Sequence, residues 1–178
     1  LIDRTGFIPN GNRTYYLGRS QPPFFALMVT ILVEEKGKEI LLQYQSQLEK
    51  EYQFWMGGAE TVSPTNPTHR HVVLMQDGSI LNRYWDDNDT PRPEAYIEDV
   101  QLASTSGKKP STVYRHIRAA ADSCWDFSSR WFRDGKGMEN IQTIDLIPFD
   151  LNCWLLFLEI ALCSFYVQQN NKALKSLL

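Results

Sequence analysis

Apolar residues recur at helical spacing along most of this chain. From Phe24 to Val33 nearly every residue is apolar, which predicts a helix that is buried on almost every side and ended by Gly37. Between 38 and 56 the apolar residues follow steps of three and four, which predicts a second helix with one core-facing stripe. That stripe contains Leu41, Tyr44, Leu48, Tyr52 and Trp55. The short break between the two helices predicts an antiparallel helical hairpin.

The pattern changes to that of strands in one place only. Residues 71–75 and 79–85 are rich in β-branched and aromatic residues and flank an Asp-Gly pair, which predicts a small β-hairpin. Further helices are expected over 111–121 and from 151 to about 168, with a continuation towards 178. We therefore expect a helix-dominated chain with one inserted hairpin.

The apolar helix that begins near 151 raises the question of a membrane. Its length is at the lower limit of a membrane span, and Glu159 lies in its middle. A charged residue is costly at the centre of a bilayer, so these features favour a core helix and no membrane association.

Three polar residues are expected to begin helices. Ser20, Ser111 and Asp150 each precede an apolar helical stretch, and short polar side chains accept hydrogen bonds from the free amides of a first turn. After Ser20, Pro22 and Pro23 fit the first turn, where a missing N–H group costs little.

Length and charge restrict the possible functions. The 178 residues, 43% of them hydrophobic, suffice for one core. The chain starts without Met and stops inside a helical pattern, so we expect residues 1–178 to be a partial domain of a longer protein. The net charge is -3 and no basic stripe is present, which argues against a nucleic-acid partner.

Neither the cysteines nor the acidic residues match a metal site. Cys124, Cys153 and Cys163 lack zinc spacing and are expected to be buried free thiols, which favours the cytoplasm over the periplasm. His69 and His71 would share one side of a strand but lack a third ligand. The loop 85–94 lacks the glycine and glutamate of an EF-hand, so a solvated or sugar-facing acidic loop is expected.

The segment around Asp126 carries the most informative chemistry. It places this carboxyl between Trp125 and Phe127, and an arginine and a third aromatic ring follow. Aromatic faces stack on sugar rings and raise a carboxyl pKa by desolvation, so that the group can act as a general acid.

Arginines on other loops add donors that suit sugar hydroxyls, notably Arg19 and Arg92. Structural roles explain these residues equally well at this point. Arg19 could cap a helix, and Arg92 could form an ion pair with Glu94.

Six segments together resemble the trehalases of glycoside hydrolase family 37, and the hairpin is most similar to bacterial members. They follow the family's order and cover nearly the whole chain: Ile8–Gly11, Gly18–Pro23, Leu81–Asp87, Thr90–Glu94, Trp125–Trp131 and Pro148–Asn152.

This resemblance implies an all-α fold, part of an (α/α)6 toroid with a small inserted β-hairpin. It also implies an inverting hydrolase that cleaves α,α-trehalose into two glucose molecules without a metal or organic cofactor, and that is monomeric when intact. Asp126 matches the general acid. The substrate-binding positions are Asn10, Arg19, Ser20, Gln21, Arg92, Pro93, Glu94 and Cys124.

Two departures from the family pattern matter. Cys124 stands where the family has a substrate-contacting glycine, and the glutamate that serves as base belongs to a C-terminal segment missing here. The Trp-Asp signature that precedes Ile8 in the family, the N-terminal signature segment, is missing as well. We therefore expect residues 1–178 alone to be inactive. The alternatives are a degenerate trehalose-binding protein, or an α-glucosidase of different specificity on the same toroid.

Overall fold

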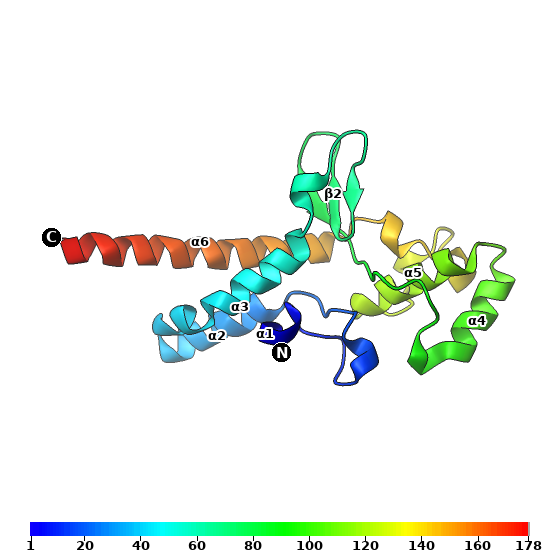
Figure 1. The fold of residues 1–178 in the computed structure, drawn as a ribbon, viewed down its shortest axis with the longest axis horizontal. Coiled ribbons are helices and arrows are strands. Elements are labelled where there is room, and N and C mark those ends of the chain that lie inside the picture. Colours follow the sequence, from blue (N-terminus) through cyan, green and yellow to red (C-terminus); the bar gives the residue numbers. More distant parts are fainter. Residues whose placement is uncertain (178) are drawn as a thin grey trace.

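The computed structural model describes residues 1–177, with side chains given through 167 and at 169. It is mostly helical and elongated (Figure 1). The α-helices are α1 Ile2–Thr5, α2 Phe25–Lys36, α3 Glu39–Met56, α4 Tyr96–Thr105, α5 Pro110–Asp122 and α6 Phe149–Leu177. Short 3-10 turns cover Thr14–Tyr16, Ala59–Thr61, Pro93–Ala95, Ser129–Trp131, Met138–Asn140 and Thr143–Asp145. These features are compatible with part of an all-α toroid.

Helices α2 and α3 form the predicted antiparallel hairpin, and α6 packs against both (Figure 1). The α3 stripe faces the core as expected, with Leu41, Leu48 and Trp55 buried. From α6 the core receives Leu151, Leu155, Leu158, Leu162 and Phe165. The apolar faces of α3 and α6 therefore pack against each other in one core.

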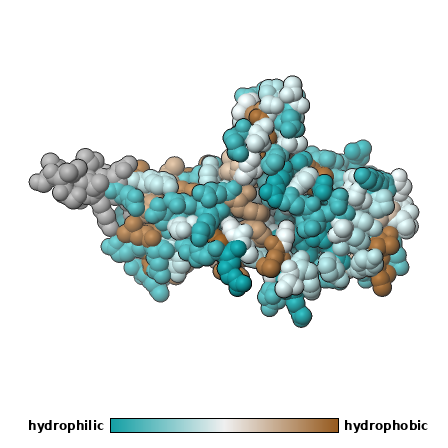
Figure 2. Space-filling view, viewed as in Figure 1, coloured by the Kyte–Doolittle hydropathy of each residue, from teal (hydrophilic) through white to brown (hydrophobic). Residues whose placement is uncertain are grey.

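Helix α2 is not buried on nearly every side, so that prediction was wrong. Ala26 and Val29 face α3 and α6, whereas Met28 and Ile31 are 51% and 59% exposed. An apolar run shows which residues favour burial, but it does not ensure that a neighbour covers each side. On the face shown in Figure 2 the surface is mostly hydrophilic, with separate apolar patches.

Helix α6 confirms the predicted helix and begins two residues earlier, at Phe149. Residue 178, the end of the expected continuation, lies outside the described residues. The face opposite the core is exposed, with Leu156 at 56% and Ile160 at 55%. By length and composition alone, Phe149–Val167 is sufficient to cross a membrane, and a third of it is buried inside the protein. It is therefore a core helix on one face only.

The predicted hairpin is part of a three-stranded antiparallel sheet. Its strands are β1 Thr68–His69, β2 Val72–Leu74 and β3 Ile80–Asn82, in the order β1-β2-β3. Val73 pairs with Thr68 on one side and with Leu81 on the other. Strand β1 was not predicted, because two residues are too few to show a period.

The two histidines of the sheet do not share one side of a strand. Arg70 lies between them in a left-handed turn with φ 48°, and His71 is buried against Trp55. Among the described residues, no group of three His, Cys, Asp or Glu side chains could hold a metal ion.

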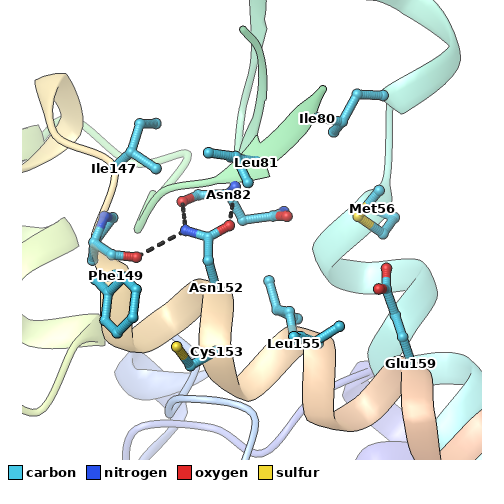
Figure 3. A pocket seen from close by; sticks show the side chains of 12 residues that line it. Met56, Ile80, Leu81, Asn82, Ile147, Phe149, Asn152, Cys153, Leu155 and Glu159 are labelled. Carbon is cyan, nitrogen blue, oxygen red and sulfur yellow. Dashed lines mark hydrogen bonds between the residues drawn. The ribbon is translucent and has the colours of Figure 1, made fainter. Parts of the chain in front are cut away.

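The sheet is fastened to the start of α6 by two asparagines. The Asn82 backbone N–H donates to Asn152 Oδ1 at 2.9 Å, and Asn152 Nδ2 donates to the Asn82 carbonyl at 2.9 Å (Figure 3). A second Asn152 Nδ2 bond reaches the Pro148 carbonyl at 2.8 Å. These bonds border a largely apolar cavity of about 550 Å3.

The three predicted caps were wrong in detail. Ser20 lies outside α2 and pairs with Pro9 in an isolated bridge, while Pro110 rather than Ser111 begins α5. Proline suits a first helical position because its fixed φ is already helical. Asp150 lies inside the first turn of α6, where it forms an ion pair with Arg130.

Candidate active site

The N-terminal loop is held against the end of α5. The Asn10 N–H donates to the Arg19 carbonyl at 2.8 Å, and the Gln21 N–H donates to the Ile8 carbonyl at 2.7 Å. The Asn10 side chain then donates to the carbonyl of Ala121 at 2.9 Å. Asn10, Arg19 and Gln21 therefore lie together next to the segment that carries Asp126.

Arg19 joins this loop to the turn after the acidic loop. Its guanidinium is fully buried, and Nη2 contacts Glu94 Oε1 at 2.5 Å. Its Nε and Nη1 groups have no hydrogen-bond partner in the described part of the chain. A buried donor without a partner is costly, so this guanidinium is held in place at a cost in stability.

Arg92 is fixed by a different carboxylate. Its Nε and Nη2 groups donate to Asp99 at 3.0 and 2.7 Å, and its backbone N–H donates to the same carboxylate at 2.8 Å. The guanidinium lies 4.7 Å from the centre of the Phe127 ring. Arg92 and Glu94 are therefore not mutual partners, because Pro93 begins a 3-10 turn that directs Glu94 towards Arg19.

Asp126 lies in a strained segment. Cys124 and Phe127 on either side have φ of 58° and 53°, in the left-handed region that favours glycine. Such conformations cost roughly 1–3 kcal/mol each and concentrate at functional sites. Bonds to Trp125 hold the segment: its N–H donates to Ser123 Oγ, and its carbonyl accepts from the Trp131 indole at 2.9 Å.

Asp126 itself is partly exposed and forms no ion pair with any described residue. Burial raises the pKa of its carboxyl, while the positive charges of Arg92 and Arg19 lower it, and the net shift is upward. The carboxyl therefore lies within reach of the charges of both arginines. A raised pKa is the property that a general acid needs.

Cys124, another predicted substrate-binding position, contacts the N-terminal loop. Its thiol donates to Gln21 Oε1. Burial and the carboxylates of Asp126 and Asp122 raise the thiol pKa, so it stays protonated at neutral pH. All three cysteines are exposed, so the prediction of buried thiols was wrong. Cys153 and Cys163 lie on the side of α6 that no other element of the described chain covers.

Ser20, like Arg19 and Arg92, is a buried residue of the predicted site. Its side chain is 1% exposed and faces Asp122 at the end of α5. The acidic loop is exposed over residues 87–90 as predicted, but Asp86 is buried and accepts from Arg118 Nε at 2.7 Å. Sequence reasoning missed Asp86, Asp99 and Asp122, because nothing in an isolated carboxylate identifies its partner.

The cavity in Figure 3 is separate from this site. It lies between the sheet and α6, and none of the predicted site residues lines it. Asn10, Arg19, Gln21, Arg92, Glu94, Cys124 and Asp126 instead gather where the N-terminal loop, the turn at 92–95 and the end of α5 meet.

A comparison with protein-family models gives one match, to the model described as Trehalase, over residues 1–176. The match includes every residue of the site described above. The chain therefore belongs to the trehalase family, glycoside hydrolase family 37.

Proposed function

We propose that this chain carries the acid half of the active site of an inverting α,α-trehalase, with Asp126 as the general acid. Membership of the family supports glycoside hydrolase activity on trehalose. The observation that favours Asp126 is its contrast with its neighbours. Glu94 and Asp99 are bound to arginines, whereas Asp126 keeps a raised pKa beside the same two arginines.

In this mechanism Asp126 donates its proton to the oxygen between the two glucose rings as the glycosidic bond breaks. The resulting carboxylate is stabilised by the nearby charges of Arg92 and Arg19. Asn10 and Gln21, which are partly exposed, would bind sugar hydroxyls, whereas the buried guanidinium of Arg19 would act through its charge and through its ion pair with Glu94.

Inversion requires a second carboxylate that activates water on the opposite face of the ring. In inverting enzymes the two carboxyl groups are about 6.5–9.5 Å apart. We assign this base to a segment outside residues 1–178, which makes this chain a partial catalytic domain. An acid and a base suffice for the reaction, so the proposal includes no metal or organic cofactor. We also propose that the intact enzyme is a monomer and that it is located in the cytoplasm.

Asp126→Asn tests this proposal in the intact enzyme, that is, this chain together with the segment that carries the base. General acid catalysis contributes about 10²–10⁴-fold, so kcat should fall by that factor with little change in KM. Asp134→Asn is the matched control, since Asp134 lies in an exposed turn and binds only its own loop. Retained turnover of trehalose in Asp126→Asn would show that another group protonates the leaving oxygen.

The Cys124 contact favours one alternative, a trehalose-binding protein without activity. The thiol occupies the amide oxygen of Gln21, which would otherwise be free to bind sugar. Calorimetric binding of trehalose by the intact protein without release of glucose would support this alternative. A panel of α-linked disaccharides, with the anomer of the product determined, would separate trehalase from another α-glucosidase.

A further inference from the structure

Asp122 is a buried carboxyl for which the mechanism has no role. It is the last residue of α5 and is fully buried, and neither carboxyl oxygen reaches hydrogen-bond geometry with a described residue. Burial raises its pKa well above the usual range, and the Asp86 carboxylate adds to this shift. A buried polar group without a hydrogen-bond partner is costly to retain and is rare in native structures.

Ser20 is one of the residues next to the carboxyl of Asp122. In the bridge with the N-terminal segment, the Arg19 carbonyl and the Gln21 N–H pair with Asn10 and Ile8. Because successive groups of an extended segment point to opposite sides, the N–H of Ser20 points the other way. Both this N–H and the Ser20 hydroxyl face the carboxyl of Asp122 and oppose its upward pKa shift.

The Ser20 hydroxyl and the Asp122 oxygens have no partner at hydrogen-bond geometry among the residues that the structure describes. The segment 19–21 is held along one edge by Ile8 and Asn10, and its other edge faces Asp122. Both residues next to Ser20 belong to the site: Arg19 carries the two unpaired N–H groups, and Gln21 contacts Cys124.

We propose that Asp122 is a positioning residue that fixes segment 19–21 through Ser20, and thereby sets where Gln21 meets the sugar and where the charge of Arg19 lies. Its consequence for sugar binding rests on the proposed function, whereas its effect on the segment does not. Asp122 itself is too deeply buried to touch substrate.

Hydrogen exchange on residues 1–178 tests the positioning directly. Asp122→Ala should accelerate exchange of the Ser20 and Gln21 amides about tenfold, while peptides from 110 to 118 keep their protection. Asp122→Asn keeps an acceptor oxygen and nearly the same volume, so its exchange should stay near that of the wild type. Unchanged exchange at Ser20 in Asp122→Ala, or equal acceleration along the whole chain, would overturn the proposal.

Two further variants control for folding. Thr143→Val removes another fully buried hydroxyl that lacks a described partner, and it should leave segment 19–21 unaffected. If Asp122→Ala does not fold, Ser20→Ala removes the hydroxyl from the other side of the same contact. This variant should also accelerate exchange at Ser20, and its failure to do so would count against Asp122.

Kinetics of the intact enzyme then connect position to binding. Asp122→Ala should raise KM for trehalose about tenfold, and Asp122→Asn should restore most of it, while the acid–base limbs of the kcat profile stay where they are. A wild-type enzyme that does not hydrolyse trehalose would refute the proposed function, but the exchange result would still decide the role of Asp122.

Discussion

Cys124 combines a strained backbone with a side chain that contacts Gln21, a proposed substrate-binding residue. Its φ of 58° is one that glycine adopts without cost, and its thiol holds the amide oxygen of Gln21. The adjacent acid keeps its raised pKa in spite of this contact. The residue therefore affects stability and sugar binding through two separate physical causes.

Cys124→Gly should stabilise the chain by up to about 1 kcal/mol, because relief of the left-handed conformation outweighs the greater freedom of glycine in the unfolded state. It should also bind trehalose more tightly in the intact enzyme, since Gln21 is released. Urea unfolding and calorimetry measure the two effects, with Cys153→Ser as a control that alters an exposed thiol on α6. A less stable glycine variant would mean that the thiol contact outweighs the strain.

Sequence reasoning proposed candidate residues for the site but not their partners. The aromatic setting of Asp126 was visible because the three residues are adjacent. Arg19 and Glu94 are 75 positions apart, and their pairing depends on how the N-terminal loop meets the turn at 92–95. Asp99 gave no signal either, since its contact with Arg92 arises only when α4 begins after that turn.

At the level of elements, the apolar period predicted helices better than it predicted their surroundings. Helices α2, α3 and α6 follow it, but α2 begins at Phe25, so Pro22 and Pro23 lie outside its first turn, and α5 begins at Pro110 rather than Ser111. One side of α2 and one side of α6 are exposed and not buried, because periodicity contains no information about which neighbouring elements cover a helix. Helix α3 is the exception, since its stripe is narrow and its partners are α2 and α6.

Glu51 on α3 is a charged-type residue within this core and should make stability depend on pH. It is 1% exposed, Oε2 lacks a partner in the described residues, and burial raises its pKa from 4.5 to about 8. The folded state therefore binds a proton that the unfolded chain releases above its own lower pKa. The resulting stabilisation is complete below about pH 4.5 and is lost as the pH rises towards 8.

Glu51→Gln isolates this effect because other titrating groups cancel in the comparison. The unfolding free energy of the wild type should fall relative to the variant by about 1.4 kcal/mol per pH unit between pH 5 and 7. Urea unfolding at three pH values in that range measures the difference. A difference that does not vary with pH would indicate that the Glu51 carboxylate is already ionised in the folded state.

The whole molecule presents one side of a reaction centre and one uncovered helix. Leu156, Ile160 and Val167 lie on the side of α6 that faces away from α2 and α3. A contiguous exposed apolar patch usually marks a surface that contacts another part of the protein or a partner. The proposed acid site has a similar one-sided character, since the carboxylates of Glu94 and Asp99 are held by Arg19 and Arg92.

Residues 1–178 alone should therefore release no measurable glucose from trehalose. The carboxyl that acts on Asp126 most directly, Glu94, is held by Arg19, and Asp122 is sealed beneath Ser20, so neither can activate water opposite the acid. A coupled glucose assay at micromolar protein, with the Asp126→Asn chain as a blank for contaminating trehalase, measures this. Glucose release near the rate of the intact enzyme, abolished in the blank, would place the base within this chain, and Glu94→Gln would then be the first variant to examine.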